Sequence, residues 1–330
     1  MNASNYTFAT GKIRYLETKL PNETDLERML DAPDLKGAFK VFHDTDYASH
    51  LLERKPEEFE EVISDDLLEN KKLLLETVPD KDFIKFLLLE YDFHNLKVIF
   101  KEKLFKKELD HLLIPLGFFN PTDFKKIILQ KEKMEIDDEI QKVIDEAEKI
   151  LHENLKPYQI EFFFDKKYFS LFKEIAKKLK NNFLIDFAKL RIDLTNLRIF
   201  LRVKNLEKDV EFLKEAIIDS GKIDFNDFIK FYSRDLEAGL KYFAKFLPTR
   251  FEKYFLEYLE GKKLWLLEKR FFEEEIEYLR KAKFIAYGPE IVTAYFYAKK
   301  SANKNVRLIM SGKLNRIERD ALKERIRKLY

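Results

Sequence analysis

One short pattern occurs three times in this sequence, at intervals of about 100 residues. It begins with an Asn, continues with an apolar residue and a Lys or Arg, and ends with three more apolar residues. The copies start at Asn95, Asn196 and Asn305, and in the first two an Asp stands three positions earlier, at Asp92 and Asp193. Recurrence at a fixed period is the signature of a repeated supersecondary unit. The pattern therefore predicts one structural piece used three times.

The similarity around this pattern extends over about 20 residues in each copy. The aligned segments are 83–103, 184–204 and 293–313. The third copy departs from the others at Ala302, which stands where they carry Asp. Two flanking segments, 116–124 and 220–228, are also alike, because each contains a Gly followed seven residues later by a Phe. The repeated piece is thus larger than the pattern itself.

Composition indicates that the repeated units are helical. Leu, Lys, Glu, Ile and Phe dominate, while only 8 of the 330 residues are Gly. This usage is typical of helical proteins, because β-barrels and sandwiches need more turn residues. Apolar residues make up 45% of the chain, enough for several cores. We therefore predict an all-α fold of three pseudo-repeated units, residues 1–135, 136–245 and 246–330.

The Asp and Asn of the pattern lie in one of the most apolar helical runs of the chain. On a helix, Asp92 and Asn95 share a face because they are three positions apart. Leaving such groups unpaired in a core costs about 1–3 kcal/mol each, so we expect them to bond the backbone of a neighbouring helix end. A catalytic set would need a third convergent group, but His94 becomes Thr195 and then Lys304 in the other copies. The pattern indicates repeated architecture rather than an active site.

Other features of the sequence argue against the common classes of catalytic and binding site. The chain has no Cys, no Gly-rich phosphate loop, no serine elbow and no zincin or EF-hand spacing. We therefore predict no catalytic residue, no cofactor and no metal site. The 62 Lys and Arg nearly balance the 60 Asp and Glu, which argues against nucleic acid as a partner. No apolar run approaches the roughly 20 residues of a membrane span, and the first residues are too polar for a signal peptide.

Three segments, taken in order, resemble a known family. The first is YTFATGKIRYLETKL with LERMLDAPDLKGAFKVFHDTDY, the second is LLLEYDFHNLKVIFKEK, and the third is YGPEIVTAYFYAKKSANKNVRLIMSGKLNRIERDALKERIRKLY. With these segments the chain resembles the C subunit of the archaeal and bacterial V/A-type rotary ATPases, called the d subunit in eukaryotes. It departs from that family at residues 299–302, which read Lys-Lys-Ser-Ala where the family often has acids. No charge-mediated contact of that helix is therefore carried over from the family.

The resemblance implies a funnel-shaped helical body with a pseudo-three-fold axis, peripheral on the cytoplasmic face of the membrane within the ATPase complex. It implies a non-catalytic rotor subunit that links the central shaft to the membrane rotor ring. Such a subunit passes torque between ATP turnover and the transport of H⁺ or Na⁺. Its expected partners are the other central-stalk subunits and the ring, with no nucleic acid and no small-molecule substrate. The alternative is an all-helical scaffold unrelated to rotary ATPases, although solenoid repeats of ~34–47 residues fit the observed period poorly.

Residues 299–330 are strongly basic, with eleven Lys and Arg against three Asp and Glu. Their periodicity predicts one helix that carries Arg319, Lys323 and Arg327 on its polar face. Given the resemblance, these three cations are candidates to face the rotor ring or the anionic lipid headgroups beside it. A helix face exposed only to solvent is the alternative.

Overall fold

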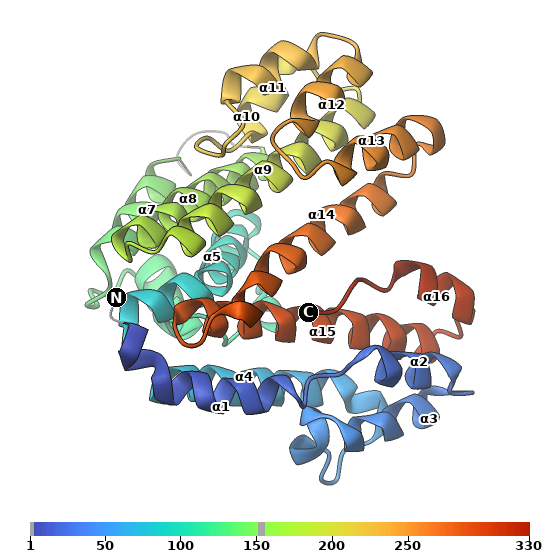
Figure 1. The fold of residues 1–330 in the computed structure, drawn as a ribbon. Helices are drawn as coiled ribbons and strands as arrows, with labels where there is room; N and C mark the ends of the chain where they lie inside the picture. The colour runs from blue at the N-terminus through green and yellow to red at the C-terminus, as the bar shows by residue number, and fades with distance from the viewer. Residues whose placement is uncertain (1–2, 151–155) are drawn as a thin grey trace. The chain divides into compact units, whose positions relative to one another are not determined.

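The computed structural model describes residues 3–150 and 156–330. Every regular element in those ranges is a helix, so the prediction of an all-α fold is confirmed. The helices form two compact units (Figure 1). Unit 1 combines Met1–Lys81 with Trp265–Tyr330, and unit 2 is Asp82–Leu264. Two segments from opposite ends of the chain therefore build one unit.

The core of unit 1 is a long, almost completely buried helix. The α-helices of this unit are α1 Thr7–Glu17, α2 Glu23–Asp31, α3 Leu35–Lys40, α4 Phe59–Thr77, α14 Leu264–Leu279, α15 Pro289–Leu314 and α16 Arg319–Arg325. Its 3-10 helices are η1 Ala3–Tyr6, η2 Val41–Asp44, η3 Asp46–His50, η4 Pro56–Glu58 and η7 Arg280–Phe284. Helix α15 packs against α1, α2, α3, α4 and α16, and buried residues lie on all of its sides. It begins directly after Gly288, whose φ of 144° favours glycine.

The end of unit 1 differs from the sequence-based prediction. Helix α15 stops at Leu314, and Arg316 adopts a left-handed φ of 56°. The N–H of Ile317 then donates to the carbonyl of Gly312 at 2.8 Å, which closes the helix end. The short α16 follows, and the chain after it is not helical. The prediction of one helix through residues 299–330 is therefore wrong.

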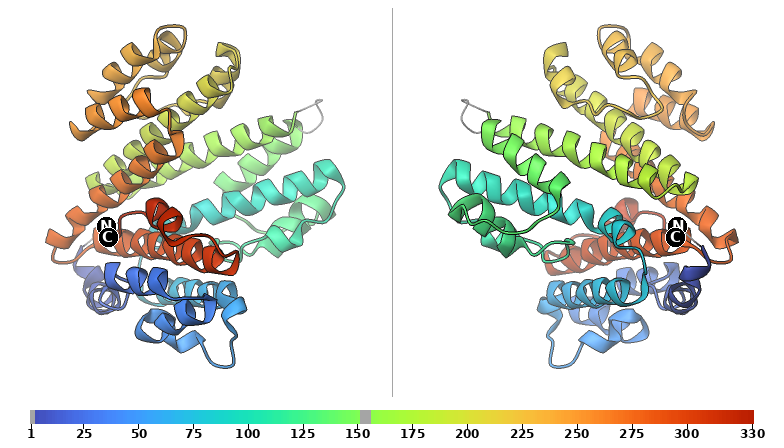
Figure 2. Two further views of the ribbon diagram at one scale, coloured as in Figure 1. Left: turned by 90° about the vertical axis from the view of Figure 1, so that its right-hand side faces the viewer. Right: turned by 90° about the vertical axis from the view of Figure 1, so that its left-hand side faces the viewer.

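Unit 2 is built around the antiparallel pair α8 and α9, which lie side by side (Figure 2). Its α-helices are α5 Lys81–Phe105, α6 Pro121–Lys125, α7 Asp138–Ile150, α8 Pro157–Lys178, α9 Asn182–Asn205, α10 Val210–Ala216, α11 Phe225–Tyr232, α12 Leu236–Ala244 and α13 Arg250–Gly261. A 3-10 turn, η5, spans Asp110–Leu112 and a π-helical turn, η6, spans Lys126–Gln130. Aromatic rings fill the core; Phe86 of α5 stacks on Phe172 of α8 with ring centroids 4.2 Å apart.

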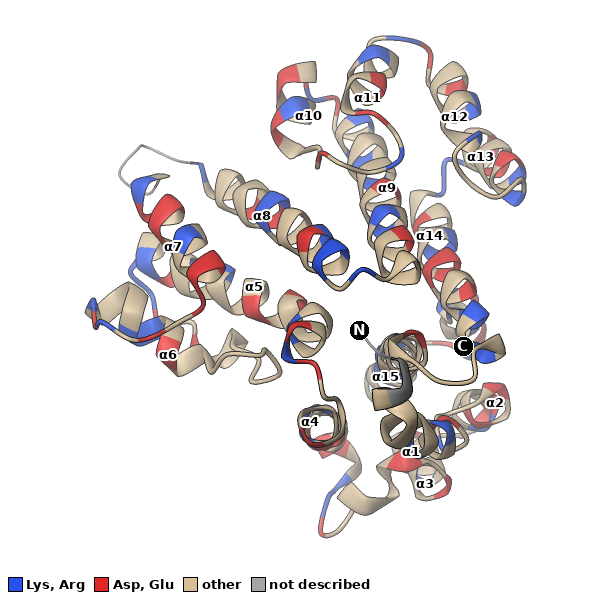
Figure 3. Cartoon of the chain, turned by 60° about the vertical axis from the view of Figure 1, so that its left-hand side comes forward, with Lys and Arg blue, Asp and Glu red and all other residues tan. Residues whose placement is uncertain are grey.

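Opposite charges pair between the helices of each unit. Lys and Arg alternate with Asp and Glu along helices such as α7 and α8 (Figure 3). In unit 2, Lys97 of α5 contacts Asp165 and lies 3.2 Å from Glu161 of α8. In unit 1, Arg307 holds the same place in the repeated pattern and contacts Glu60 of α4 at 2.7 Å. The basic position of the pattern thus bridges to another helix in two copies. The three repeats with their proposed boundaries and the pseudo-three-fold arrangement remain predictions.

Candidate functional site

The repeated Asn residues of unit 2 each bind both backbone groups, the N–H and the carbonyl, of one downstream residue. Asn95 Nδ2 donates to the carbonyl of Ile114 at 2.7 Å, and its Oδ1 accepts from the N–H of the same residue at 2.8 Å. Asn196 makes the same pair of bonds to Ile218, at 2.7 and 2.9 Å. We call this arrangement an amide clamp. Each clamp gives the buried amide one donated and one accepted hydrogen bond, and it fixes a non-helical segment against the helix that carries the Asn.

Asp92 binds the chain immediately after the first amide clamp. Its two carboxylate oxygens accept from the N–H groups of Phe118 and Phe119, each at 3.0 Å. The peptide before these donors belongs to Gly117, where a Cβ atom would lie 2.1 Å from Asp92 Oδ1. The glycine is therefore required because the backbone approaches the carboxylate so closely.

Asp193 repeats this arrangement after the second amide clamp. It accepts from the N–H of Lys222 at 3.0 Å and from that of Ile223 at 3.1 Å. A Cβ atom on Gly221 would lie 2.0 Å from Asp193 Oδ1. Burial raises the pKa of Asp193 to about 6, while the bonds from Ile223 and Lys222 oppose that rise. The similarity of the two flanking Gly segments in the sequence thus has a common structural cause.

The third copy, in unit 1, keeps the amide clamp but lacks the carboxylate. Asn305 Nδ2 donates to the carbonyl of Arg327 at 2.8 Å, and its Oδ1 accepts from the N–H of Arg327 at 3.0 Å. Ala302 occupies the position of the Asp, so no carboxylate is available to bind the following backbone. This clamp holds the last residues of the chain against α15.

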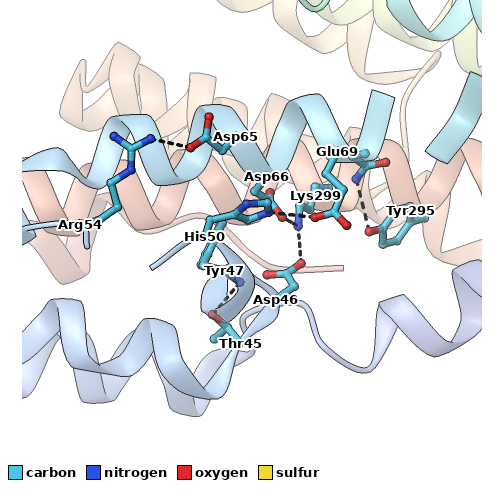
Figure 4. A network of polar contacts seen from close by, with 11 residues as sticks. Thr45, Asp46, Tyr47, His50, Arg54, Asp65, Asp66, Glu69, Tyr295 and Lys299 are labelled. Atoms are coloured by element: carbon cyan, nitrogen blue, oxygen red, sulfur yellow. Dashed lines mark hydrogen bonds and ion pairs between the residues drawn. The ribbon is translucent and has the colours of Figure 1, made fainter. Parts of the chain in front are cut away.

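A buried charge cluster lies one turn before Ala302 on the same helix, and sequence reasoning did not find it. Lys299 Nζ contacts the carboxylates of Asp46 in η3 and Asp66 in α4, the latter at 2.5 Å (Figure 4). The three side chains are 3%, 8% and 6% exposed, respectively. Two carboxylates therefore share one ammonium group inside unit 1. The one sequence signal was the Lys299–Lys300 pair, which directly follows the apolar run Ala294–Ala298 of the same helix.

Further polar groups surround this charge cluster. Tyr47 donates its hydroxyl hydrogen to Asn303 Oδ1, and Asn70 Nδ2 donates to the hydroxyl of Tyr295 at 3.3 Å. Burial raises the pKa of Asp66 to about 7; Lys299 opposes this rise and the neighbouring Asp46 adds to it. Burial also raises the pKa of Asp46. The cluster ties together η3, α4 and α15, which are far apart in the sequence.

The family model described as ATP synthase (C/AC39) subunit matches residues 9–325. The chain belongs to this family. The C subunit of the V-type sodium ATPase of Enterococcus hirae is 24% identical over 321 residues, covering 96% of this chain and 97% of the relative. The C subunit of the A-type ATP synthase of Methanocaldococcus jannaschii is 25% identical over 353 residues, covering 96% of this chain and 85% of the relative. The C subunit of the A-type ATP synthase of a Desulfurococcus species is 23% identical over 337 residues, covering 97% of this chain and 90% of the relative.

In this member of the ATP synthase C/AC39 family, the repeated Asn and Asp side chains form hydrogen bonds with backbone groups. Hydrogen bonds to peptide groups account for both ends of each Asn amide and for both oxygens of each repeated Asp. In the part of the chain that the structure describes, no group of three or more His, Asp or Glu could hold a metal ion. Nor does any helix there have the length and apolar character needed to cross a membrane. The arrangement fixes chain segments against the helices that carry the repeated residues.

The basic residues at the end of this C/AC39 subunit have acidic neighbours in unit 1. Arg319 of α16 contacts Asp31 at 2.6 Å and Glu27 at 3.1 Å, both on α2. Lys323 contacts the same Glu27 at 2.9 Å. Arg327 contributes its backbone to the amide clamp, and its guanidinium lies over a Phe ring. The side chains of Arg319 and Lys323 remain 39% and 51% exposed, so they are accessible despite these pairs.

Proposed function

We propose that this chain is the non-catalytic central-stalk subunit of a V/A-type rotary ATPase. In this role it links the central shaft to the membrane rotor ring and passes torque between ATP hydrolysis or synthesis and the transport of H⁺ or Na⁺. The observation that carries the proposal is the family match across residues 9–325, together with relatives named as C subunits that align along most of their length. The proposed partners are the other central-stalk subunits and the ring, with the protein peripheral on the cytoplasmic face.

The internal construction of the two units supports this role. A spacer that carries torque must resist local deformation, and close-packed helices with fixed connections do so. The amide clamps at Asn95, Asn196 and Asn305 fix the connections that leave the long helices. We further propose that the three repeated units surround a pseudo-three-fold axis, which would form a socket for the shaft. A helical scaffold unrelated to rotary ATPases is not favoured, because the family match spans nearly the whole chain.

Purification of the chain from its own cells with an affinity tag tests the proposal. We expect the catalytic, shaft and ring subunits of a rotary ATPase to be recovered in fixed ratio, with ATPase activity in the complex. The isolated chain should neither bind nor hydrolyse ATP in a calorimetric titration with Mg²⁺. Recovery without any of the ATPase subunits, or a stoichiometric nucleotide site on the isolated chain, would overturn the proposal.

A further inference from the structure

The charge cluster of Lys299, Asp46 and Asp66 joins three elements that are far apart in the sequence. Asp46 lies in η3, Asp66 in α4 and Lys299 in α15 (Figure 4). Because one ammonium faces two carboxylates, the fully ionised cluster carries an excess negative charge. Such a charge in a site this buried is costly unless another positive charge or a proton compensates it.

The hydrogen bonds of the two carboxylates show which of their oxygens lack a positive charge or a proton to balance them. One oxygen of each carboxylate contacts Lys299, while the other two oxygens, Asp46 Oδ1 and Asp66 Oδ2, are buried without a partner. Asn70 stands one turn after Asp66 on α4, and its Oδ1 is also buried without a partner. The site therefore contains three acceptors without a donor, and the two unpaired buried donors nearby, Ser301 Oγ and Asn303 Nδ2 of α15, do not reach them. A carboxyl group that takes up a proton becomes a donor, so one proton corrects both the charge and the hydrogen bonding.

The surrounding groups are compatible with proton exchange at this site. Four other titratable side chains face the cluster. Tyr47 and His50 come from η3, Glu69 comes from α4, and Tyr295 comes from α15. Glu69 contacts His50 Nε2 at 3.0 Å. A cavity of about 560 Å³ is lined by Asp46, Asp66, Asn70 and Lys299, and also by Lys12 of α1 and by Lys19, which follows that helix. Water in that cavity can carry protons to the carboxylates.

We propose that the Lys299–Asp46–Asp66 cluster is a proton-binding site, and that its proton holds residues 41–50 against α4 and α15. With the proton on Asp66, the cluster is neutral and its buried acceptors gain a donor. When the proton leaves, the excess negative charge repels Asp46 from Asp66, and residues 41–50 open to water. Because burial has raised the pKa of Asp66 to about 7, this change falls near neutral pH. The inference goes beyond the proposed function, since it concerns unit 1 of the isolated chain.

Amide hydrogen exchange of the purified chain at pH 6 and pH 8 tests the proposal. After correction for intrinsic exchange, we expect residues 41–50 to be about tenfold more protected at pH 6, the ratio for one site that titrates near pH 7. Asp66→Asn should remove this difference. The matched control is Asp65→Asn, because Asp65 is 41% exposed and pairs with Arg54 at 2.8 Å. The control should keep the wild-type difference.

Two results would overturn the proposal. One is protection of residues 41–50 that does not differ between pH 6 and pH 8 in the wild-type chain. The other is a pH difference that survives in Asp66→Asn. Should that variant fail to fold, infrared spectra of Asp193→Asn decide the question, because this substitution removes the buried carboxyl outside the cluster whose pKa is raised, to about 6. The carbonyl band of a buried protonated carboxyl should be present at pH 6 and lost by pH 8, and its absence at pH 6 would also overturn the proposal.

Discussion

Gly117 approaches Asp92 so closely that a Cβ atom on the glycine would lie 2.1 Å from Asp92 Oδ1. We therefore expect Gly117→Ala to lower the free energy of unfolding by about 1–3 kcal/mol. The added methyl group must displace the carboxylate that accepts from Phe118 and Phe119. Chemical denaturation followed by circular dichroism measures the change.

Gly11→Ala is the matched control for this substitution. A Cβ atom on Gly11, in α1, would meet nothing within 4 Å. We expect Gly11→Ala to be neutral or to stabilise by about 0.5–1 kcal/mol, because alanine is the better helix former. Equal effects of the two substitutions would contradict the assigned role of the Asp92 carboxylate.

The clamp residues provide a second prediction. Asn196→Ala leaves both the N–H and the carbonyl of Ile218 without their side-chain partner in a buried place. We expect a loss of about 2–4 kcal/mol in the free energy of unfolding. Asn315→Ala is the control, since Asn315 is exposed and bonds only the carbonyl of Ser311 one turn earlier; its effect should stay within about 0.5 kcal/mol. A small effect at Asn196 would show that the clamp contributes little to stability.

These contacts also show how far the sequence predicted the structure. Periodicity alone placed Asp92 and Asn95 inside an apolar helix, and the cost of burial predicted backbone partners for them. The partner segments could not be identified, because a clamp joins a helix to a connection about 20 residues away and depends on how that connection folds back.

Two other features of the structure, the end of α15 and the charge cluster around Lys299, could not be predicted because nearby residues in the sequence do not indicate them. Helix α15 ends before Arg316 although neither Gly nor Pro stands between Leu314 and Arg319, so periodicity predicted a continuous helix. The turn depends instead on the left-handed φ of Arg316 and a backbone bond to Gly312. The charge cluster around Lys299 brings together three distant segments, and no spacing in the sequence encodes such a meeting.

Removal of the cation from that cluster provides a third prediction. Lys299→Met leaves two buried carboxylates facing each other, and we expect a loss of about 3–5 kcal/mol at pH 8. The loss should be smaller at pH 5, where protonation relieves the repulsion. Lys72→Met, at a side chain 76% exposed on α4, should change stability by less than about 0.5 kcal/mol. Denaturant titration of both variants at the two pH values provides the comparison. A loss at Lys299 that does not depend on pH would be inconsistent with this account.

The raised carboxyl pKa values predict how stability depends on pH. The pKa of Asp193 is about 6 and that of Asp66 about 7 in the folded chain, against an ordinary value of 3.8. At these two groups the folded chain therefore holds more protons than the unfolded chain between about pH 4 and pH 7. Since the unfolded state binds fewer protons there, each group lowers the free energy of unfolding as pH rises, by at most about 1.4 kcal/mol per pH unit.

Denaturant titrations between pH 4 and pH 8 test this dependence. Relative to the wild-type chain, Asp66→Asn should remove the part of the decline that extends up to pH 7. Asp193→Asn should remove the part of the decline in the free energy of unfolding that ends near pH 6. The five His residues contribute equally to the pH dependence of the free energy of unfolding in each variant, so the comparison between variants cancels their contribution. A wild-type decline that neither substitution alters would assign the dependence to other groups.

The last prediction concerns the exposed cations at the end of unit 1. We propose that Arg319, Lys323 and Arg327 face the rotor ring or the anionic headgroups beside it, although Arg319 and Lys323 also pair with Glu27 of α2. Reversing them to Glu would introduce repulsion with Glu27, so substitution by Gln separates assembly from stability. The triple Gln variant should keep its circular dichroism spectrum and nearly its melting temperature, because exposed ion pairs contribute little. Its binding to membranes that contain the ring but lack this protein should be weaker than that of the wild-type chain, and the deficit should be largest at low salt, where attraction is least screened. A triple variant that binds as well as the wild-type chain at low salt would assign these cations to their contacts within unit 1 alone, with α2 for Arg319 and Lys323 and with Phe272 for Arg327.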